Sequence, residues 1–272
     1  MIIDGHAHAF GEFGSIERLI PILDSLKVDK VVLCPAGADP TAEAHKPKLK
    51  ESFIITRPRL HLLSNRFLRH GPSSLMNRDP GNHHVYSLKE KKPDRIIQFY
   101  WVNVLEEDFD KDLLENFNKM KFNGIKLHQC IVPFNNDSQE MQKLSQIAAE
   151  KKLPIFIHIY NAKEAKKFVA LTQKNKDTNY IVAHMMGMEQ IIKNSSYLEN
   201  IYLDTSTYYI ISKKRLLKAI KYFGVDHIIM GSDSPIGYDN LENIILKIKS
   251  LIIKDVEKEM IMGGNLKQLL KL

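Results

Sequence analysis

The stretch that decides the fold runs from Pro154 to His184 and reads PIFIHIYNAKEAKKFVALTQKNKDTNYIVAH. It begins with a short apolar run over 154–159 and ends with a second one over 180–184. Between them, Asn161 stands three residues before Glu164, a spacing typical of a capped helix N-terminus. Continuous apolar runs of this length are typical of strands buried on both faces, as in parallel sheets. The stretch therefore predicts a strand, a helix and a second, parallel strand.

The same alternation extends in both directions along the chain. Further strand candidates lie at residues 2–8, 30–34, 95–103, 124–128, 201–204 and 227–231. Between them, residues 16–26 place apolar side chains on one helical face, and Asp137 and Asp239 each precede a Glu by three residues. Gly224 stands where a helix should end. Eight alternating units imply an α/β fold closed into a (β/α)8 TIM barrel. A doubly wound open sheet is the alternative, but no GxGxxG follows the first strand to favour it.

One long connection departs from the regular alternation of strands and helices. Barrels of this kind use about 250 residues as one unit, so we expect residues 1–272 to form a single domain. The link between Cys34 and Arg95 is too long for a simple helical connection. We interpret approximately residues 36–94, which are rich in proline, histidine and basic residues, as an insertion after the second strand. Because barrel strands end at the active-site face, the insertion should overhang the site or form a contact such as a homodimer; the alternative is a poorly ordered surface excursion.

Composition and charge argue against several classes of protein. Hydrophobic residues make up 44% and charged residues 26% of the chain, as in ordinary globular proteins. Without a long uncharged apolar segment, and with a strand beginning near Met1, we expect neither a secretory signal nor a membrane association. Cys34 and Cys130 lack CxxC spacing, which favours a reducing cytoplasm. The net charge of +7 lacks any accompanying nucleic-acid motif, so we assign it to solvated, Lys-rich helix faces.

The first strand ends in a pair of histidines, in the sequence Asp4-Gly5-His6-Ala7-His8. Side chains two apart on a strand share a face, so His6 and His8 should point the same way at the mouth of the barrel. Two imidazoles on one face can chelate a divalent metal. Alone the pair is weak evidence, because two surface or core histidines are the more common explanation.

The ends of three other strands favour a metal site over two unrelated histidines. His158 ends the fifth strand, His184 ends the sixth, and Asp233 lies just past the eighth. Strand ends converge in a closed barrel, so five metal-competent side chains should meet on one face. Such ligands suit Zn²⁺, with Mn²⁺ or Fe²⁺ as alternatives, and we expect one ion rather than two.

Candidate substrate-binding residues come from the third and fourth strands. Ile125 and Leu127 are apolar and should pack on the helices. Lys126 and His128 take the other face and should look into the barrel. Lys126 would then be a structural or substrate-binding cation, and its carboxylation, which would bridge two metal ions, is an open alternative. Asn103 follows the third strand and is a further candidate, with ordinary loop packing as the alternative.

At these residues the chain resembles the amidohydrolase superfamily, and most of all the branch of TIM-barrel metal-dependent hydrolases that includes the aminocarboxymuconate-semialdehyde decarboxylases. The matching text is Asp4–His8, Gly124–His128, Pro154–His158, Val182–His184, Gly231–Pro235 and the closing Gly264-Asn265-Leu266. The resemblance covers nearly the whole chain apart from the insertion.

The resemblance implies a role for each matching residue. His6, His8, His158 and Asp233 would hold the metal. Asp233 would also accept a proton, and His184 would orient the attacking water or the substrate. In two-metal relatives that histidine binds the second ion. The related metal-dependent deoxyribonucleases usually have a Glu where this chain has Lys126, which argues against nuclease activity.

The activity that these residues imply is hydrolysis of an amide, ester or lactone bond of a small molecule. A metal-bound water would be the nucleophile, with its pKa lowered toward neutrality. Decarboxylation of a small carboxylic acid at the same metal is the alternative. A nuclease or nucleic-acid-binding protein is a weaker one, because aromatic and basic residues do not interleave in the sequence.

Overall fold

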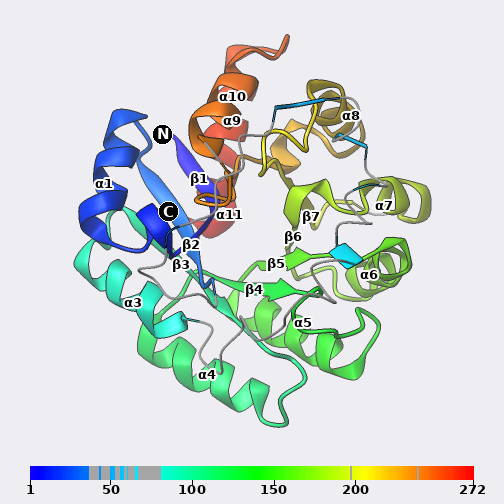
Figure 1. Cartoon of the computed structure of the whole chain (residues 1–272). Coiled ribbons are helices and arrows are strands. Elements are labelled where there is room, and N and C mark those ends of the chain that lie inside the picture. Colours follow the sequence, from blue (N-terminus) through cyan, green and yellow to red (C-terminus); the bar gives the residue numbers. More distant parts are fainter. Residues whose placement is uncertain are drawn as a thin grey trace.

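The eight strands of the computed structural model follow one another around a barrel (Figure 1). The structure describes residues 1–36, 43, 50–52, 56–57, 60, 65–66, 81–196, 198–237 and 239–272. The strands are β1 (Ile3–His8), β2 (Lys30–Cys34), β3 (Ile96–Trp101), β4 (Gly124–His128), β5 (Ile155–His158), β6 (Tyr180–Val182), β7 (Ile201–Asp204) and β8 (Ile228–Ile229). Each is parallel to its neighbour in chain order.

The segment after β8 brings the last strand back to the first. Gly5 N donates to Met230 O at 2.8 Å, and Asp233 N donates to His6 O at 2.7 Å. Farther along, His8 N donates to Ser234 O at 2.7 Å. These bonds lay residues 230–234 beside β1 and complete the ring of strands. The predicted (β/α)8 barrel is confirmed, and the open sheet is excluded.

Helices surround the strands in Figure 1. They are α1 (Ile16–Ser25), α3 (Asn82–Lys91), α4 (Phe109–Met120), α5 (Gln139–Lys151), α6 (Ala162–Lys174), α7 (Met188–Asn194), α8 (Lys213–Phe223), α9 (Asn240–Lys249), α10 (Asp255–Glu259) and α11 (Asn265–Leu270). Short helical turns lie at Gly11–Phe13, Ala183–Met185, Val225–His227 and Met260–Gly264. Within the described part of the chain, no helix combines the length and the apolar character needed to cross a membrane.

Three of the four caps expected from the sequence stand at the expected position. Asn161 caps α6 by accepting a bond from Glu164 N at 2.9 Å, and Gly224 ends α8 with a φ of 86°. The cap of α5 is Ser138, whose Oγ accepts from Met141 N at 3.3 Å, and the Asp137 carboxylate is bound instead to Lys167 Nζ at 2.9 Å. Asp239 precedes α9 but makes no side-chain capping bond.

The C-terminal end of the predicted insertion belongs to the barrel itself. Helix α3 packs against β2 and β3, with Val85 and Leu88 buried in the core, in the place of the regular helix between these strands. The sequence did not predict this helix, since few of its positions are apolar. The extra residues of the connection therefore precede Asn82, and most of 36–81 lies outside the described residues.

Alternation along the strands divides the core into two layers. Val31 and Leu33 of β2 belong to the layer between strands and helices, whereas Val32 and Cys34 belong to the barrel interior. Phe156 of β5 is also interior, and Ile155 and Ile157 on either side are not. This alternation determines which strand-end side chains face the axis of the barrel.

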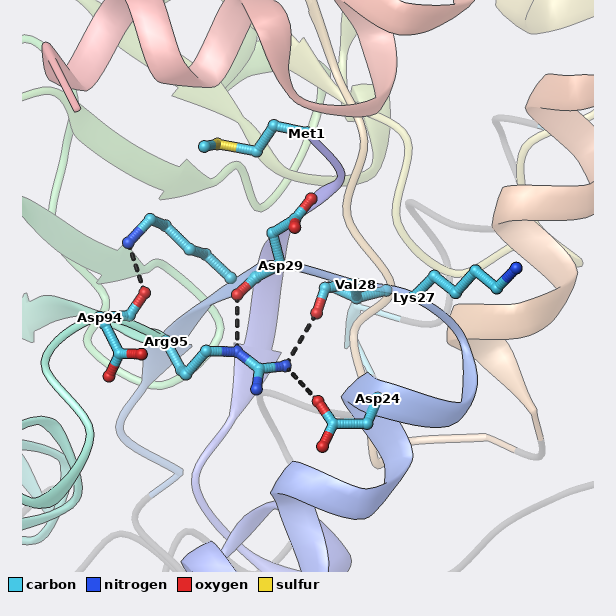
Figure 2. A pocket seen from close by; sticks show the side chains of 8 residues that line it. Met1, Asp24, Lys27, Val28, Asp29, Asp94 and Arg95 are labelled. Atoms are coloured by element: carbon cyan, nitrogen blue, oxygen red, sulfur yellow. Dashed lines mark hydrogen bonds and ion pairs between the residues drawn. The ribbon is translucent and has the colours of Figure 1, made fainter.

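At the end of the barrel where the strands begin, a pocket of about 530 Å³ is lined by charged residues (Figure 2). Arg95 donates through Nη2 to Asp24 Oδ1 at 2.7 Å and through Nε to Asp29 O at 2.8 Å. Ile2 N donates to Asp29 Oδ2 at 2.6 Å. These bonds tie the starts of β1, β2 and β3 together, so we assign this end a structural role.

Candidate metal centre and active site

Imidazoles from four strands gather at the opposite end, where the strands terminate. The ring centroids of His6 and His8 lie 5.0 Å apart, and those of His6 and His184 lie 5.4 Å apart. His158 lies 5.1 Å from His184 and 3.9 Å from His128. The prediction that strand ends converge on one small region is therefore correct for these five histidines.

Hydrogen bonds decide which nitrogen of His6 and of His8 carries the proton. Pro35 O lies 3.2 Å from His8 Nδ1 and can only accept, so Nδ1 of His8 donates. The Asp204 carboxylate lies 3.2 Å from His6 Nδ1 and likewise makes this nitrogen the donor. Both rings therefore present the lone pair of Nε2. A partner that fixes the second nitrogen in this way is typical of metal-bound histidines.

The two Nε2 lone pairs meet the carboxylate of Asp233. Asp233 Oδ1 lies 3.3 Å from His8 Nε2 and 3.7 Å from His6 Nε2. All three ligand atoms lie within 4.8 Å of one another and all three residues are buried. Facing acceptors of this kind need a cation between them, and two imidazoles and a carboxylate suit a divalent transition metal. The donor set of His6, His8 and Asp233 therefore fits a metal ion.

Asp204, which ends β7, was assigned no role from the sequence and lies at the centre of the site. Its Oδ2 accepts from His6 Nδ1, from the backbone N–H of His184 at 3.2 Å and from the hydroxyl of Ser206. Ser206 Oγ in turn lies 2.9 Å from His184 Nδ1. The rule that found His158 and His184 could have found Asp204, because it too stands at the C-terminal end of a strand.

His184 and Asp233 occupy turns with strained backbone conformations. The φ of His184 is 52° and that of Asp233 is 64°, in the left-handed region that non-glycine residues seldom adopt. Thr207 Oγ1 donates to Asp233 Oδ2 at 2.9 Å. Arg215 Nη2 donates to Met185 O at 2.7 Å, directly after His184. The strain at two predicted catalytic residues is balanced by bonds to side chains and backbone next to them.

Gly231 is required by the close approach of β8 to the site. A Cβ at this position would lie 2.8 Å from the Cβ of His6 and would overlap the Asp204 carboxylate. Asp4 fixes the next residue, accepting from Ser232 N at 2.8 Å and from Ser232 Oγ at 2.6 Å. These contacts set the position of Asp233 relative to β1.

Lys126 enters the same cluster from β4. Its side chain is completely buried, and its Nζ lies 2.8 Å from His6 Nε2 and 4.1 Å from the centroid of the Phe156 ring. Ile125 and Leu127 pack into the layer between strands and helices. Lys126 thus faces the barrel interior, where its ammonium donates to the lone pair of a candidate metal ligand.

His158 and His128 form a separate group beside the first. His158 is not among the residues that share the 4.8 Å cluster with His6, His8 and Asp233; it clusters with His128 and Cys130 instead. Its Nε2 lies 3.1 Å from Asn65 Oδ1. The sequence did not indicate Asn65, which comes from the long connection after β2.

Among the described residues, no contact brings Asn103 into the cluster. Its Oδ1 accepts from Leu105 N at 3.1 Å and its Nδ2 donates to Glu106 Oε1 at 3.0 Å. The amide therefore stabilises the loop before α4, which is the loop-packing alternative stated above.

Burial and neighbouring charges favour the neutral form of three of the imidazoles. Burial, followed by the charge of Lys126, holds the pKa of His6 and of His128 well below the usual range. Burial, followed by His128, does the same to the pKa of His158. Burial acts to raise the pKa of Asp233, but His184 and His8 outweigh it and the pKa is lowered. Neutral imidazoles and an ionised carboxylate are the protonation states that bind metals.

Comparison with known proteins identifies a family and a fold. A family model described as Amidohydrolase matches residues 77–272. No curated protein matches the sequence. One similar solved structure is 2,6-dihydroxybenzoate decarboxylase from Rhizobium, at 14% identity over 99% of this chain and 98% of that one, with a TM-score of 0.72.

Two further solved structures share the fold. Dihydroxybenzoic acid decarboxylase from Polaromonas sp. JS666, with bound manganese and the inhibitor 2-nitroresorcinol, is 15% identical over 100% of this chain and 97% of that one, with a TM-score of 0.72. A probable 2-pyrone-4,6-dicarboxylic acid hydrolase from Acinetobacter baumannii, with citric acid bound, is 14% identical over 100% and 99% of the two chains, with a TM-score of 0.71. At such identities the likeness shows the fold alone. The family match, however, covers well over half of the sequence, and the chain belongs to the amidohydrolase family.

Proposed function

We propose that this chain is a metal-dependent lyase that decarboxylates a small carboxylic acid. The observation that carries the proposal is the buried ammonium of Lys126 beside the ligand set of His6, His8 and Asp233. Its contacts are the neutral His6 imidazole and the Phe156 ring, so neither partner cancels its charge. Burial lowers the pKa of Lys126, and the carboxylates of Asp233 and Asp204 act in the opposite direction without contacting the ammonium. An anionic substrate would supply a counter-ion in direct contact.

The charge balance of the site points to the same class of substrate. The positive charge of a divalent ion and Lys126 together exceeds the negative charge of Asp204 and Asp233. An excess of positive charge in a buried site favours a carboxylate ligand. The similar structures include two decarboxylases of aromatic acids, which agrees with this choice of substrate.

In the proposed reaction, Lys126 binds the acidic substrate and holds it against the metal ligands. When bound, a divalent ion supplies positive charge that stabilises the negative charge developing on the substrate. The bond from carbon to carboxylate breaks, CO₂ leaves, and the electron pair stays on carbon. Ser206 Oγ, whose proton goes to Asp204, accepts from His184 Nδ1 at 2.9 Å, so we assign Nε2 of a doubly protonated His184 to deliver the proton. Water then restores the proton on His184.

Hydrolysis of an ester, lactone or amide is the second candidate. The observation that favours it is the lowered pKa of Asp233, together with the bond from Thr207 Oγ1 to Asp233 Oδ2. An ionised, oriented carboxylate suits a residue that takes a proton from water. In this reaction His184 would orient the water or the substrate.

The remaining features of the proposal follow the sequence. We propose Zn²⁺ as the ion, with Mn²⁺ or Fe²⁺ as alternatives, and His158 as a further ligand. We propose that His128 contacts the substrate, that residues 1–272 act as one domain and that the compartment is the cytoplasm. A homodimer through the connection after β2 and the absence of nucleic-acid binding are parts of the same proposal.

The experiment that tests the proposal offers both classes of substrate to one preparation. Protein loaded with Zn²⁺ or Mn²⁺ is incubated with hydroxybenzoic and unsaturated dicarboxylic acids, and CO₂ release is followed. Esters and lactones are followed by acid release at constant pH. We expect CO₂ from at least one acid, loss of this activity with chelator, and a large loss in Lys126→Met. Acid release from a lactone without CO₂ from any acid would support hydrolysis instead, and turnover unaffected by chelator would refute both.

A further inference from the structure

Thr207 lies in the loop that leads from β7 to α8 and has a strained backbone. Its φ is 61°, in the left-handed region. This conformation is a marked outlier for a β-branched residue such as threonine, because the two heavy atoms on Cβ crowd the backbone. Strain of this kind persists only where the surrounding structure enforces it, and it is concentrated at functional sites. The Thr207 side chain is therefore a candidate for a role in the site.

Backbone bonds hold Thr207 against the segment that carries Asp233. Thr207 N donates to Ser232 O at 3.3 Å, and Thr207 O accepts from Ile210 N at 2.9 Å. The residue is buried. The first bond joins the loop after β7 to the residue directly before Asp233, so the strained conformation places the Thr207 side chain beside the proposed metal ligand.

The Thr207 hydroxyl lies between the two proposed catalytic residues. Oγ1 donates its only proton to Asp233 Oδ2 at 2.9 Å. Oγ1 also lies 3.4 Å from His184 Nδ1, which is a longer contact than the 2.9 Å between His184 Nδ1 and Ser206 Oγ. The principal partner of the Thr207 hydroxyl is therefore the Asp233 carboxylate.

The two oxygens of Asp233 have different surroundings. Oδ1 lies 3.3 Å from His8 Nε2 and 3.7 Å from His6 Nε2, among the candidate metal ligands. Oδ2 is the oxygen that accepts from Thr207. A hydroxyl that donates to Oδ2 competes with an ion for the lone pairs of that oxygen, so Oδ1 is the one left to bind the ion. Carboxylates that bind metals commonly have a hydrogen-bond partner of this kind, which orients them.

We propose that Thr207 is a positioning residue of the metal centre: its hydroxyl directs Oδ1 of Asp233 toward the ion and keeps Oδ2 from coordinating. This inference rests on the proposed function, because it takes Asp233 as a metal ligand, and it adds how that ligand is oriented. A carboxylate that binds through one oxygen occupies one coordination position rather than two. The position that remains is open to the substrate.

Thr207→Val and Thr207→Ser separate the hydroxyl from the rest of the side chain. Valine keeps the branched shape and the strained backbone but removes the donor, whereas serine keeps the donor. Chelator-treated protein is titrated with Mn²⁺ in competition with a chromophoric chelator. We expect Thr207→Val to lose about 10–100-fold in Mn²⁺ affinity. Thr207→Ser should bind Mn²⁺ as the wild type does.

Thr178→Val is the matched control. Thr178 is also buried, and its Oγ1 donates to Ser145 O at 2.7 Å just before β6 begins, away from the ends of the strands. Loss of this hydroxyl should lower the urea midpoint of unfolding and leave Mn²⁺ affinity unchanged. The same result for Thr207→Val would give Thr207 a purely structural role and overturn the inference, while the metal centre would stand. A wild type that binds no Mn²⁺ would overturn both.

A crystal structure of the wild-type protein with Mn²⁺ tests the division of the two oxygens without any variant. We expect Asp233 to coordinate the ion through Oδ1 alone and to keep the bond from Thr207 Oγ1 on Oδ2. Coordination of the ion by both oxygens of Asp233 would contradict the inference, whether or not Thr207→Val folds.

Discussion

Asp204 Oδ2 accepts a hydrogen bond from His6 Nδ1 across 3.2 Å, between side chains that are 198 residues apart in the sequence. This bond makes Nδ1 the protonated nitrogen of His6 and directs the Nε2 lone pair toward Asp233 and Lys126. A residue at the end of β7 thereby decides how a residue of β1 can bind a metal. The relationship is the basis of the first prediction.

Asp204→Asn should weaken metal binding without unfolding the barrel. Losing the charged acceptor behind a metal-bound histidine costs about 10–100-fold in metal affinity. The measurement is competition with a chromophoric chelator, and Asp24→Asn on the opposite end of the barrel is the matched control. Equal affinity in Asp204→Asn and wild type would show that Asp204 does not hold His6 for a metal.

Asp233→Asn should abolish turnover and leave folding largely intact. The carboxylate is a proposed metal ligand, and in the hydrolytic alternative it also takes the proton from water, a role whose loss costs about 10²–10⁴-fold in rate. The asparagine can still accept the bond from Thr207, so the turn at residue 233 should survive. Activity is measured beside thermal unfolding of the same preparation. Full activity in this variant would refute the proposed mechanism.

Gly231→Ala should destabilise the protein and disturb the site together. The added Cβ meets the Asp204 carboxylate and the His6 Cβ, both of which are buried and fixed. Overpacking of this kind costs about 1–3 kcal/mol. Gly264→Ala is the control, because the nearest atom to its Cβ would lie 3.4 Å away. Equal unfolding free energies for the two variants in urea would contradict the close approach at Gly231.

The pH dependence of stability should carry a contribution from Asp4. Burial is the main cause that raises the pKa of this carboxyl from 3.8 to about 7. The folded protein therefore binds a proton that the unfolded chain releases, so stability falls as the pH rises from about 4 to about 7 and is level above that range. A shift of this size corresponds to about 4 kcal/mol, since each pKa unit is worth about 1.4 kcal/mol.

Urea unfolding of chelator-treated protein at pH 4.5, 6 and 8 measures the Asp4 contribution. Asp4→Asn cannot ionise, so its stability should lose this part of the pH dependence. Parallel pH profiles for the wild type and Asp4→Asn would contradict the burial of an ionisable Asp4.

The sequence predicted the barrel well because its strands are short apolar runs that end in polar residues. The same regularity located His6, His8, His184 and Asp233 at one end. Strand lengths were less accurate: β6 ends at Val182 because His184 turns away with a φ of 52°. The end of β8 was also overestimated, since the strand ends at Ile229 and Met230 N donates to Ile261 O, outside the sheet.

Sequence patterns could not predict the contacts that complete the site. Asn65 meets His158 across 93 residues, from a connection with no periodic signal. The separation of His158 from the group of His6, His8 and Asp233 depends on ring orientation, which strand alternation does not determine. Asn103 stands at a strand end like the other candidates, yet its amide bonds within its own loop, because two local partners lie within reach.

The most direct test of the central claim is a crystal structure of the protein grown with Mn²⁺, in which anomalous scattering locates the ion. We predict one strong peak within coordinating distance of His6 Nε2, His8 Nε2 and Asp233 Oδ1. An ion bound elsewhere, with these three atoms uncoordinated, would contradict the account, and so would a fully active crystal preparation that contains no metal.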